Sequence, residues 1–134
     1  MKAAQFVKYA FVIGAVAIMI TLCSVDPRTP EQIEAAKAAA AMEVKRTNLV
    51  FSAVKALQGS LRDPGSLQIE HAGVTTADSV CIEYRAKNGF GGYTAGVAVG
   101  IEGKTLSTSV DAWNTHCADK DGFFMTSAAQ DAVK

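Results

Sequence analysis

An uncharged segment from Tyr9 to Val25, between Lys8 and Asp26, constrains the fold of this chain more than any other feature. A helix over this segment would be roughly 26 Å long, near the lower limit for crossing the hydrocarbon core of a membrane. Its large side chains are Tyr9, Phe11, Val12, Ile13, Val16, Ile18, Met19, Ile20 and Leu22. We therefore predict that residues 1–25 form a single-pass membrane anchor.

The charges around this segment predict its orientation. Two lysines and no acidic residue precede it, whereas all 13 acidic residues follow it. The positive-inside rule then places the N-terminus in the cytoplasm of a bacterial cell and the rest of the chain on the periplasmic side of the inner membrane. A cleaved signal peptide and a lipoprotein with Cys23 as the attachment site are the alternatives. The segment lacks a clear Ala-x-Ala cleavage site, and Leu22 is larger than the residue that usually precedes a lipidated cysteine.

A long helix is predicted from Pro30 to about Ser60. Thr29 suits the N-cap, and Pro30 suits the first helical position. The alanine-rich residues 35–41 favour a helix but offer few side chains for packing. We therefore interpret residues 26–48 as a linker and helical stalk.

The second half of this helix carries a stripe of larger apolar residues. Phe51, Val54, Leu57 and Leu61 recur at spacings of three and four, as expected for a helix that covers a sheet. The stop signal is Gly59 with the turn at residues 63–66, after which the period of the pattern changes from 3.6 to two.

Four strands are predicted after this turn, at residues 66–71, 80–85, 93–101 and 104–109. Their alternating side chains and short connections favour an antiparallel meander. A short helix from Val110 to about Ala118 and a frayed or weakly helical tail complete the chain. The expected fold class is α+β, with residues 49–134 as one exported domain.

The overall charge argues against a nucleic-acid partner. Thirteen Lys and Arg residues balance 13 Asp and Glu residues, and 49% of the 134 residues are hydrophobic. A nucleic-acid-binding surface needs a basic excess, and a disordered chain has fewer apolar residues. The composition is that of a small domain with a core.

Cys81 and Cys117 are the two cysteines beyond the predicted anchor. A small exported domain is stabilised by a cross-link, because its core is limited and its compartment is oxidising. We therefore predict a disulfide between them. Two free buried thiols are the alternative, which a cytoplasmic location would favour.

The pattern of potentially reactive residues does not indicate an enzyme, a metal site or a cofactor site. His71 and His116 lack the spacing of zinc ligands, and no G-x-S-x-G sequence exists to form a triad with His71 and Asp111. Glu70 and Glu83 could in principle form a carboxylate pair, but side chains on a solvated sheet face are the commoner explanation. We predict no catalytic residue, no metal ligand and no cofactor.

A glycine-rich connection lies between the second and third predicted strands. It contains Asn88, Phe90, Gly91, Gly92 and Tyr93, and a strand rather than a helix follows it, so it is not a phosphate-binding loop. One interpretation is structural, with glycines for positive φ angles and close approach. The other is a partner-binding loop that presents its aromatic side chains.

Several segments together resemble a family of small proteobacterial and prophage-encoded envelope proteins. These segments are LRDPGSLQI at 61–69, VCIE at 80–83, AKNGFGGY at 86–93, and Ala112-Trp113 with Cys117. Members of that family have a signal, lipoprotein or anchor segment, a KDPxS turn, a CGEVNAKNxFGGY strand and loop, and a late cysteine after a tryptophan. The resemblance covers roughly residues 57–117 and implies an exported α+β module in which Cys81 and Cys117 pair. Ile82 departs from the family pattern, which has glycine there, and the family supplies no catalytic residues to carry over.

These features favour a non-enzymatic accessory protein that binds or supports an envelope or membrane protein complex. A prophage superinfection-exclusion protein is one alternative. A pilin-like structural subunit is another, although Pro27, Pro30 and the missing pilin processing site argue against it.

Overall fold

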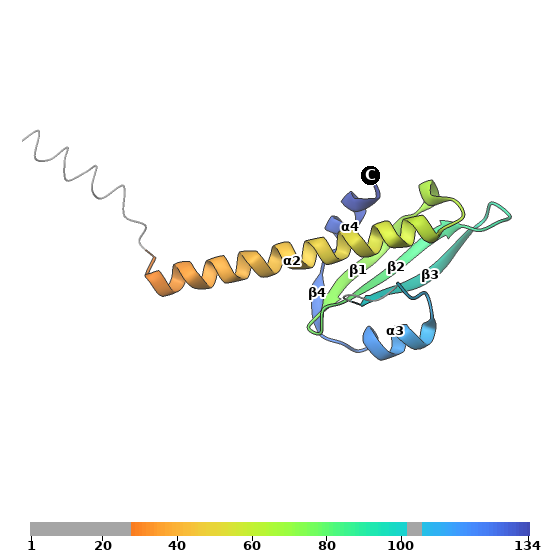
Figure 1. Ribbon diagram of the computed structural model, residues 1–134. Coiled ribbons are helices and arrows are strands. Elements are labelled where there is room, and N and C mark those ends of the chain that lie inside the picture. Colours follow the sequence, from red (N-terminus) through yellow and green to blue (C-terminus); the bar gives the residue numbers. More distant parts are fainter. Residues whose placement is uncertain (1–27, 102–105) are drawn as a thin grey trace, which may run out of the picture. The chain divides into compact units, whose positions relative to one another are not determined.

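The computed structural model describes residues 28–101 and 106–134 (Figure 1). The chain divides into two compact units, residues 1–38 and residues 39–134, of which the second contains the sheet. The predicted anchor at residues 1–25 lies outside the described residues. Among the described residues, no helix combines the length and the apolar character that crossing a bilayer requires.

Helix α2 extends from Pro30 to Ser60, as the sequence predicts. Its first turn is closed by a capping box, in which the backbone N of Gln32 donates to Thr29 Oγ1 (3.3 Å) and the backbone N of Thr29 donates to Gln32 Oε1 (2.9 Å). The residues from Glu34 to Lys45 are all exposed, in keeping with their alanine-rich composition.

The buried stripe of α2 differs from the predicted one mainly at Phe51. Val54 and Leu57 are buried as expected, but Phe51 is 39% exposed, and Val50 and Ala53 lie in the core instead. Positions 50, 53, 54 and 57 keep the spacing of three and four, so the helical period is right and the choice of Phe51 is wrong. The small side chain of Ala53 lies where the helix passes close to Gly100 of the sheet.

The sheet has four antiparallel strands in the order β3-β2-β1-β4. Their bounds are Gln68–Thr75 for β1, Ser79–Lys87 for β2, Tyr93–Ile101 for β3 and Gly122–Phe124 for β4. The predicted meander of the first three strands is confirmed. The prediction of a strand at 104–109 is wrong for its described part, where Ser107 forms only an isolated bridge with Val99.

The fourth strand is β4, which pairs with β1 at the opposite edge of the sheet. A Cβ atom at Gly122 would lie 2.6 Å from the carbonyl oxygen of Val74, so only glycine allows the chain to enter the sheet here. Phe123 is then opposite Val74, and Phe124 is opposite Gly73.

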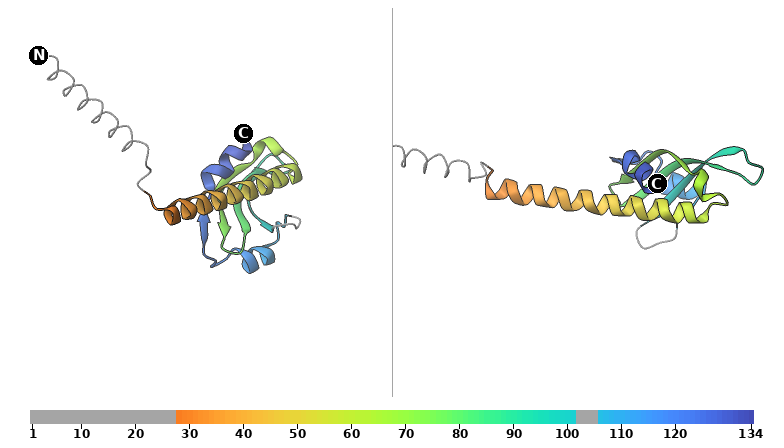
Figure 2. Two further views of the ribbon diagram at one scale, coloured as in Figure 1. Left: turned by 60° about the vertical axis from the view of Figure 1, so that its left-hand side comes forward. Right: turned by 90° about the horizontal axis from the view of Figure 1, so that it is seen from above.

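We call the side of the sheet that packs against helices α2 and α4 the first face (Figures 1 and 2). Helix α4 spans Thr126–Val133, and its Ala129 and Ala132 are buried in the same core as Val54 and Leu57. The side chain of Gln130 donates to the backbone oxygen of Ile69 (3.2 Å). The tail was expected to be frayed or weakly helical, and these contacts explain why it forms a helix. The sheet residues of this core are Ile69, Ala72, Val74, Val80, Ile82 and Ala98.

We call the opposite side, which carries Cys81 and its cross-strand neighbour Val99, the second face. Helix α3 spans Val110–His116 and lies on this side of the sheet (Figure 1). Its N-cap is Ser109, whose hydroxyl accepts a bond from the backbone N of Asp111 (3.1 Å). The short helix is therefore confirmed, ending slightly before the predicted boundary.

Candidate functional site

The connection between β2 and β3 is organised by Asn88. Its side-chain oxygen accepts hydrogen bonds from the backbone N atoms of Phe90 (2.9 Å) and Gly92 (3.1 Å). Its backbone N donates to the oxygen of Gly92 (2.8 Å), and its backbone oxygen accepts from Gly91 (3.1 Å). An asparagine side chain that mimics backbone in this way fixes a turn locally, without help from the rest of the core. The tip of the hairpin is consequently preorganised.

This turn presents one large apolar side chain to solvent. Gly91 has φ +83°, a left-handed conformation that other residues adopt only with strain. Gly91 has this conformation, and Asn88 accepts hydrogen bonds from the backbone on both sides of Gly91. In this turn Phe90 is 100% exposed. Its exposure is a property of the hydrogen-bonded frame around it and not of a long, unsupported loop.

Tyr93 begins β3 at the base of the same turn. It is 45% exposed, and the ammonium of Lys87 lies 5.8 Å from the centroid of its ring. On the other side of the turn, the backbone N of Lys87 donates to the hydroxyl of Ser66 (2.9 Å), within the 3-10 helix η1 (Pro64–Ser66). The structure therefore brings the five predicted partner-binding residues together at one hairpin tip, with its base tied to η1.

A disulfide joins Cys81 of β2 to Cys117, the C-cap residue of α3. The S–S distance is 2.01 Å and the Cα atoms are 5.8 Å apart, within the normal range for such bonds. The predicted pairing is confirmed, and the alternative of two free thiols is wrong. The bond attaches α3 to the second face.

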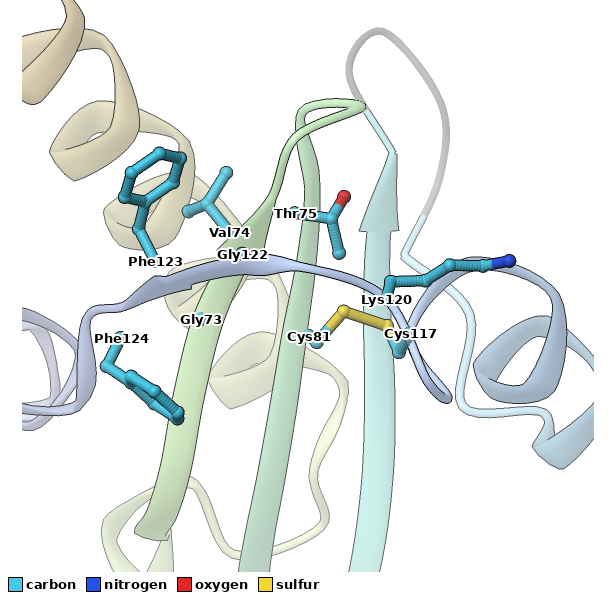
Figure 3. A pocket seen from close by; sticks show the side chains of 9 residues that line it. All are labelled: Gly73, Val74, Thr75, Cys81, Cys117, Lys120, Gly122, Phe123 and Phe124. Carbon is cyan, nitrogen blue, oxygen red and sulfur yellow. A yellow bond between two sulfur atoms is a disulfide. The ribbon is translucent and has the colours of Figure 1, made fainter.

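A shallow groove of ≈ 120 Å³ lies beside this disulfide (Figure 3). It is lined by both cysteines, Lys120 and the two aromatic residues of β4, which project from opposite sides of the strand. Phe124 is 93% exposed and Phe123 is 43% exposed. The sequence did not single out this pair, because Asp119, Asp121 and Gly122 directly before it are typical of a solvated turn. The adjacent phenylalanines were the available signal.

The carboxylate and histidine side chains that were considered for catalysis or metal binding lie on several different elements. Glu70 and Glu83 line one groove of the second face, and Glu70 Oε1 accepts a charged contact from Arg85 Nε at 3.3 Å. His71 is exposed on β1, and Asp111 is exposed in the first turn of α3. The residues that the structure describes contain no cluster of three or more groups suited to a metal ion. The disulfide also removes both cysteines as ligands.

Comparison with known proteins does not assign this chain to a family. The chain matches no family model, no curated protein and no solved structure. The hairpin tip, the disulfide and the exposed aromatic residues are therefore the observations on which a function can be based.

Proposed function

We propose that this chain is a non-enzymatic, membrane-anchored periplasmic protein that binds a protein of an envelope or membrane complex through the tip of its β2–β3 hairpin. The observation that carries the proposal is the complete exposure of Phe90 on a turn fixed by Asn88. An exposed aromatic side chain on a rigid turn loses little conformational entropy on binding, which is the property of an interface anchor.

The surroundings of Phe90 suit a protein partner. Tyr93 adds a half-exposed aromatic ring, and Lys87 adds a positive charge beside it. Aromatic residues are enriched at the centres of protein interfaces, and a charged rim contributes to orientation and association rate. A small-molecule site would instead need a concave pocket around the aromatic side chain, whereas Phe90 is fully exposed to solvent.

Two features support the location. The uncharged segment at residues 9–25 has the composition of a membrane anchor and precedes all the acidic residues. The Cys81–Cys117 disulfide is the kind of bond that persists in an oxidising compartment such as the periplasm. Mass spectrometry of the non-reduced protein from isolated membranes tests this part. We expect an intact N-terminus and a disulfide, and a processed chain outside the membrane fraction would contradict it.

Site-specific cross-linking tests the binding surface. A photoreactive phenylalanine analogue is placed at position 90 of the full chain in living cells, and the same analogue at position 124 serves as a control of similar exposure. We expect position 90 to cross-link to one envelope protein that position 124 does not reach. The substitution F90S should also abolish co-purification of that protein, whereas F124S should leave it unchanged. Equal cross-linking from both positions, or retention of the partner by F90S, would contradict the proposal.

The identity of the captured protein separates the versions of this function. A resident membrane complex indicates an accessory subunit, and a phage entry component indicates superinfection exclusion. Filaments built from the chain itself would instead indicate a structural subunit, for which position 90 would cross-link to another copy.

A further inference from the structure

Strand β3 is an edge strand, and among the described residues the backbone groups on the outer side of Tyr93, Ala95 and Val97 have no pairing strand. Val99 directs its backbone groups outward, because its N donates to Ser107 (2.7 Å) and its oxygen accepts from Ser107 (2.9 Å). Backbone groups alternate in direction along a strand, so Val97, Ala95 and Tyr93 direct theirs the same way, away from β2. Within residues 28–101 and 106–134, the only β-bridge outside the four strands is the one between Val99 and Ser107.

Ser107 covers this edge at Val99, but the stretch from Tyr93 to Val97 lacks the charges and prolines that usually protect such strands. The sequence of β3, YTAGVAVGI, contains no charged residue and no proline. Natural proteins place charges, prolines or short strands at exposed edges, because an unprotected edge pairs with another chain. The other edge of the same sheet follows this rule, since β4 has only 3 residues.

We propose that β3 pairs with β3 of a second copy of this chain, antiparallel and with a two-fold axis at Ala95. Ala95 then lies opposite its own counterpart, and Tyr93 lies opposite Val97 of the second copy. Each opposed pair exchanges two backbone hydrogen bonds, so the outward groups of all three residues are satisfied. The result is a continuous eight-stranded sheet made from two four-stranded ones.

The side chains of the second face favour this register. Glu83 and Val97 line a groove of ≈ 400 Å³ beside Val110, which is 64% exposed. In the dimer, Tyr93 of the second copy is placed next to Val97 at the mouth of this groove, together with its Lys87 ammonium. A positive, aromatic side-chain pair from one copy is therefore brought beside an acidic, apolar groove of the other, twice in each dimer. A foreign strand would need its own matching side chains, whereas a second copy supplies them by symmetry.

The dimer does not use Phe90, which precedes β3, although it shares Tyr93 and Lys87 with the base of the hairpin tip. The two proposals are therefore tested separately, at position 90 for the partner and at position 95 for the dimer. The pairing involves a short stretch of strand, so its area is below the roughly 1,200 Å² of a standard interface, and we expect concentration-dependent dimerisation. A membrane anchor on each copy would raise their effective concentration.

Sedimentation of the full chain in detergent over a range of concentrations provides the first test. We expect a monomer–dimer equilibrium that A95P weakens by about tenfold or more, because proline removes an outward N–H. The matched variant A95V keeps that N–H and should dimerise like the native chain. A95P should still fold, because the N–H of Ala95, like that of Val99, is directed away from β2. Retention of the disulfide and of the native circular dichroism spectrum checks this.

Cross-linking in membranes tests the register itself. In a C23S background, A95C should form a disulfide-linked dimer on mild oxidation, because opposed Cα atoms in a hydrogen-bonded pair are about 5.5 Å apart. T108C, which is also exposed, should not form this dimer.

Three results would overturn the proposal: a chain that stays monomeric at all concentrations, equal dimerisation of A95P and A95V, or cross-linking of T108C as efficiently as A95C. A95C linked only to a different protein would show that β3 pairs with a foreign strand, which also overturns it.

Discussion

The two faces of the sheet are held by different forces. On the first face, Leu57 and Ile82 are both 0% exposed, within a core that α2 and α4 close completely. On the second face, a short helix is fixed by one disulfide, and Val110 and Phe124 remain 64% and 93% exposed. Apolar burial therefore provides most of the stability on one side of the sheet. The other side retains surface that is available for recognition.

Removing a core side chain from the first face should have the largest effect on stability. Leu57→Ala deletes a fully buried side chain between α2 and the sheet, and we expect it to lower the free energy of unfolding by about 2–5 kcal/mol. Chemical denaturation followed by circular dichroism measures this change.

Met42→Ala is the matched control on the same helix. Met42 is 55% exposed, so its truncation should change the free energy of unfolding by less than about 0.5 kcal/mol. Equal losses for Leu57→Ala and Met42→Ala would contradict the idea that the first face provides the stability.

Removing the disulfide should loosen the second face and leave the first face assembled. The bond closes a loop with a sequence separation of 36 residues. Replacing both cysteines by alanine should therefore lower the free energy of unfolding by about 3–4 kcal/mol in the loop-entropy model. The signal of Trp113, the single tryptophan, reports on α3 and should change before the far-ultraviolet signal of the sheet is lost. Simultaneous loss of both signals would show that the two faces are one cooperative unit.

The sequence predicts several elements of the fold well, because their signals are local. The capping box at Thr29 and Gln32 and the alternation in β2 and β3 each act within a few residues. The disulfide was also predictable, since only two cysteines lie beyond the hydrophobic segment. In the helical stripe the sequence fails at Phe51, because the choice between Phe51 and Ala53 depends on how closely the helix approaches the sheet.

The elements that the sequence did not reveal depend on contacts distant in sequence. β4 exists because Gly122 permits close approach to Val74, and its 3 residues carry too short a pattern to be distinguished from a turn. Helix α4 is stabilised by the burial of Ala129 and Ala132, which alanine spacing alone does not distinguish from a frayed end. At the candidate site, the turn residues were predictable, but the full exposure of Phe90 required the geometry of the hairpin.

The two phenylalanines of β4 offer the finest comparison, because adjacent residues of one strand face opposite sides of the sheet. The guanidinium carbon of Arg46 in α2 lies 3.4 Å from the centroid of the Phe123 ring. Phe124, by contrast, is 93% exposed on the second face. We expect Phe123→Ala to lower the free energy of unfolding by about 1 kcal/mol, through the lost cation–π contact and partial burial. Phe124→Ala should change it by less than about 0.5 kcal/mol. Parallel thermal and chemical denaturation of the two variants measures the difference. A larger loss for Phe124→Ala would mean that the second face contributes to folding through this side chain, and the division between a stabilising face and an open face would then not hold.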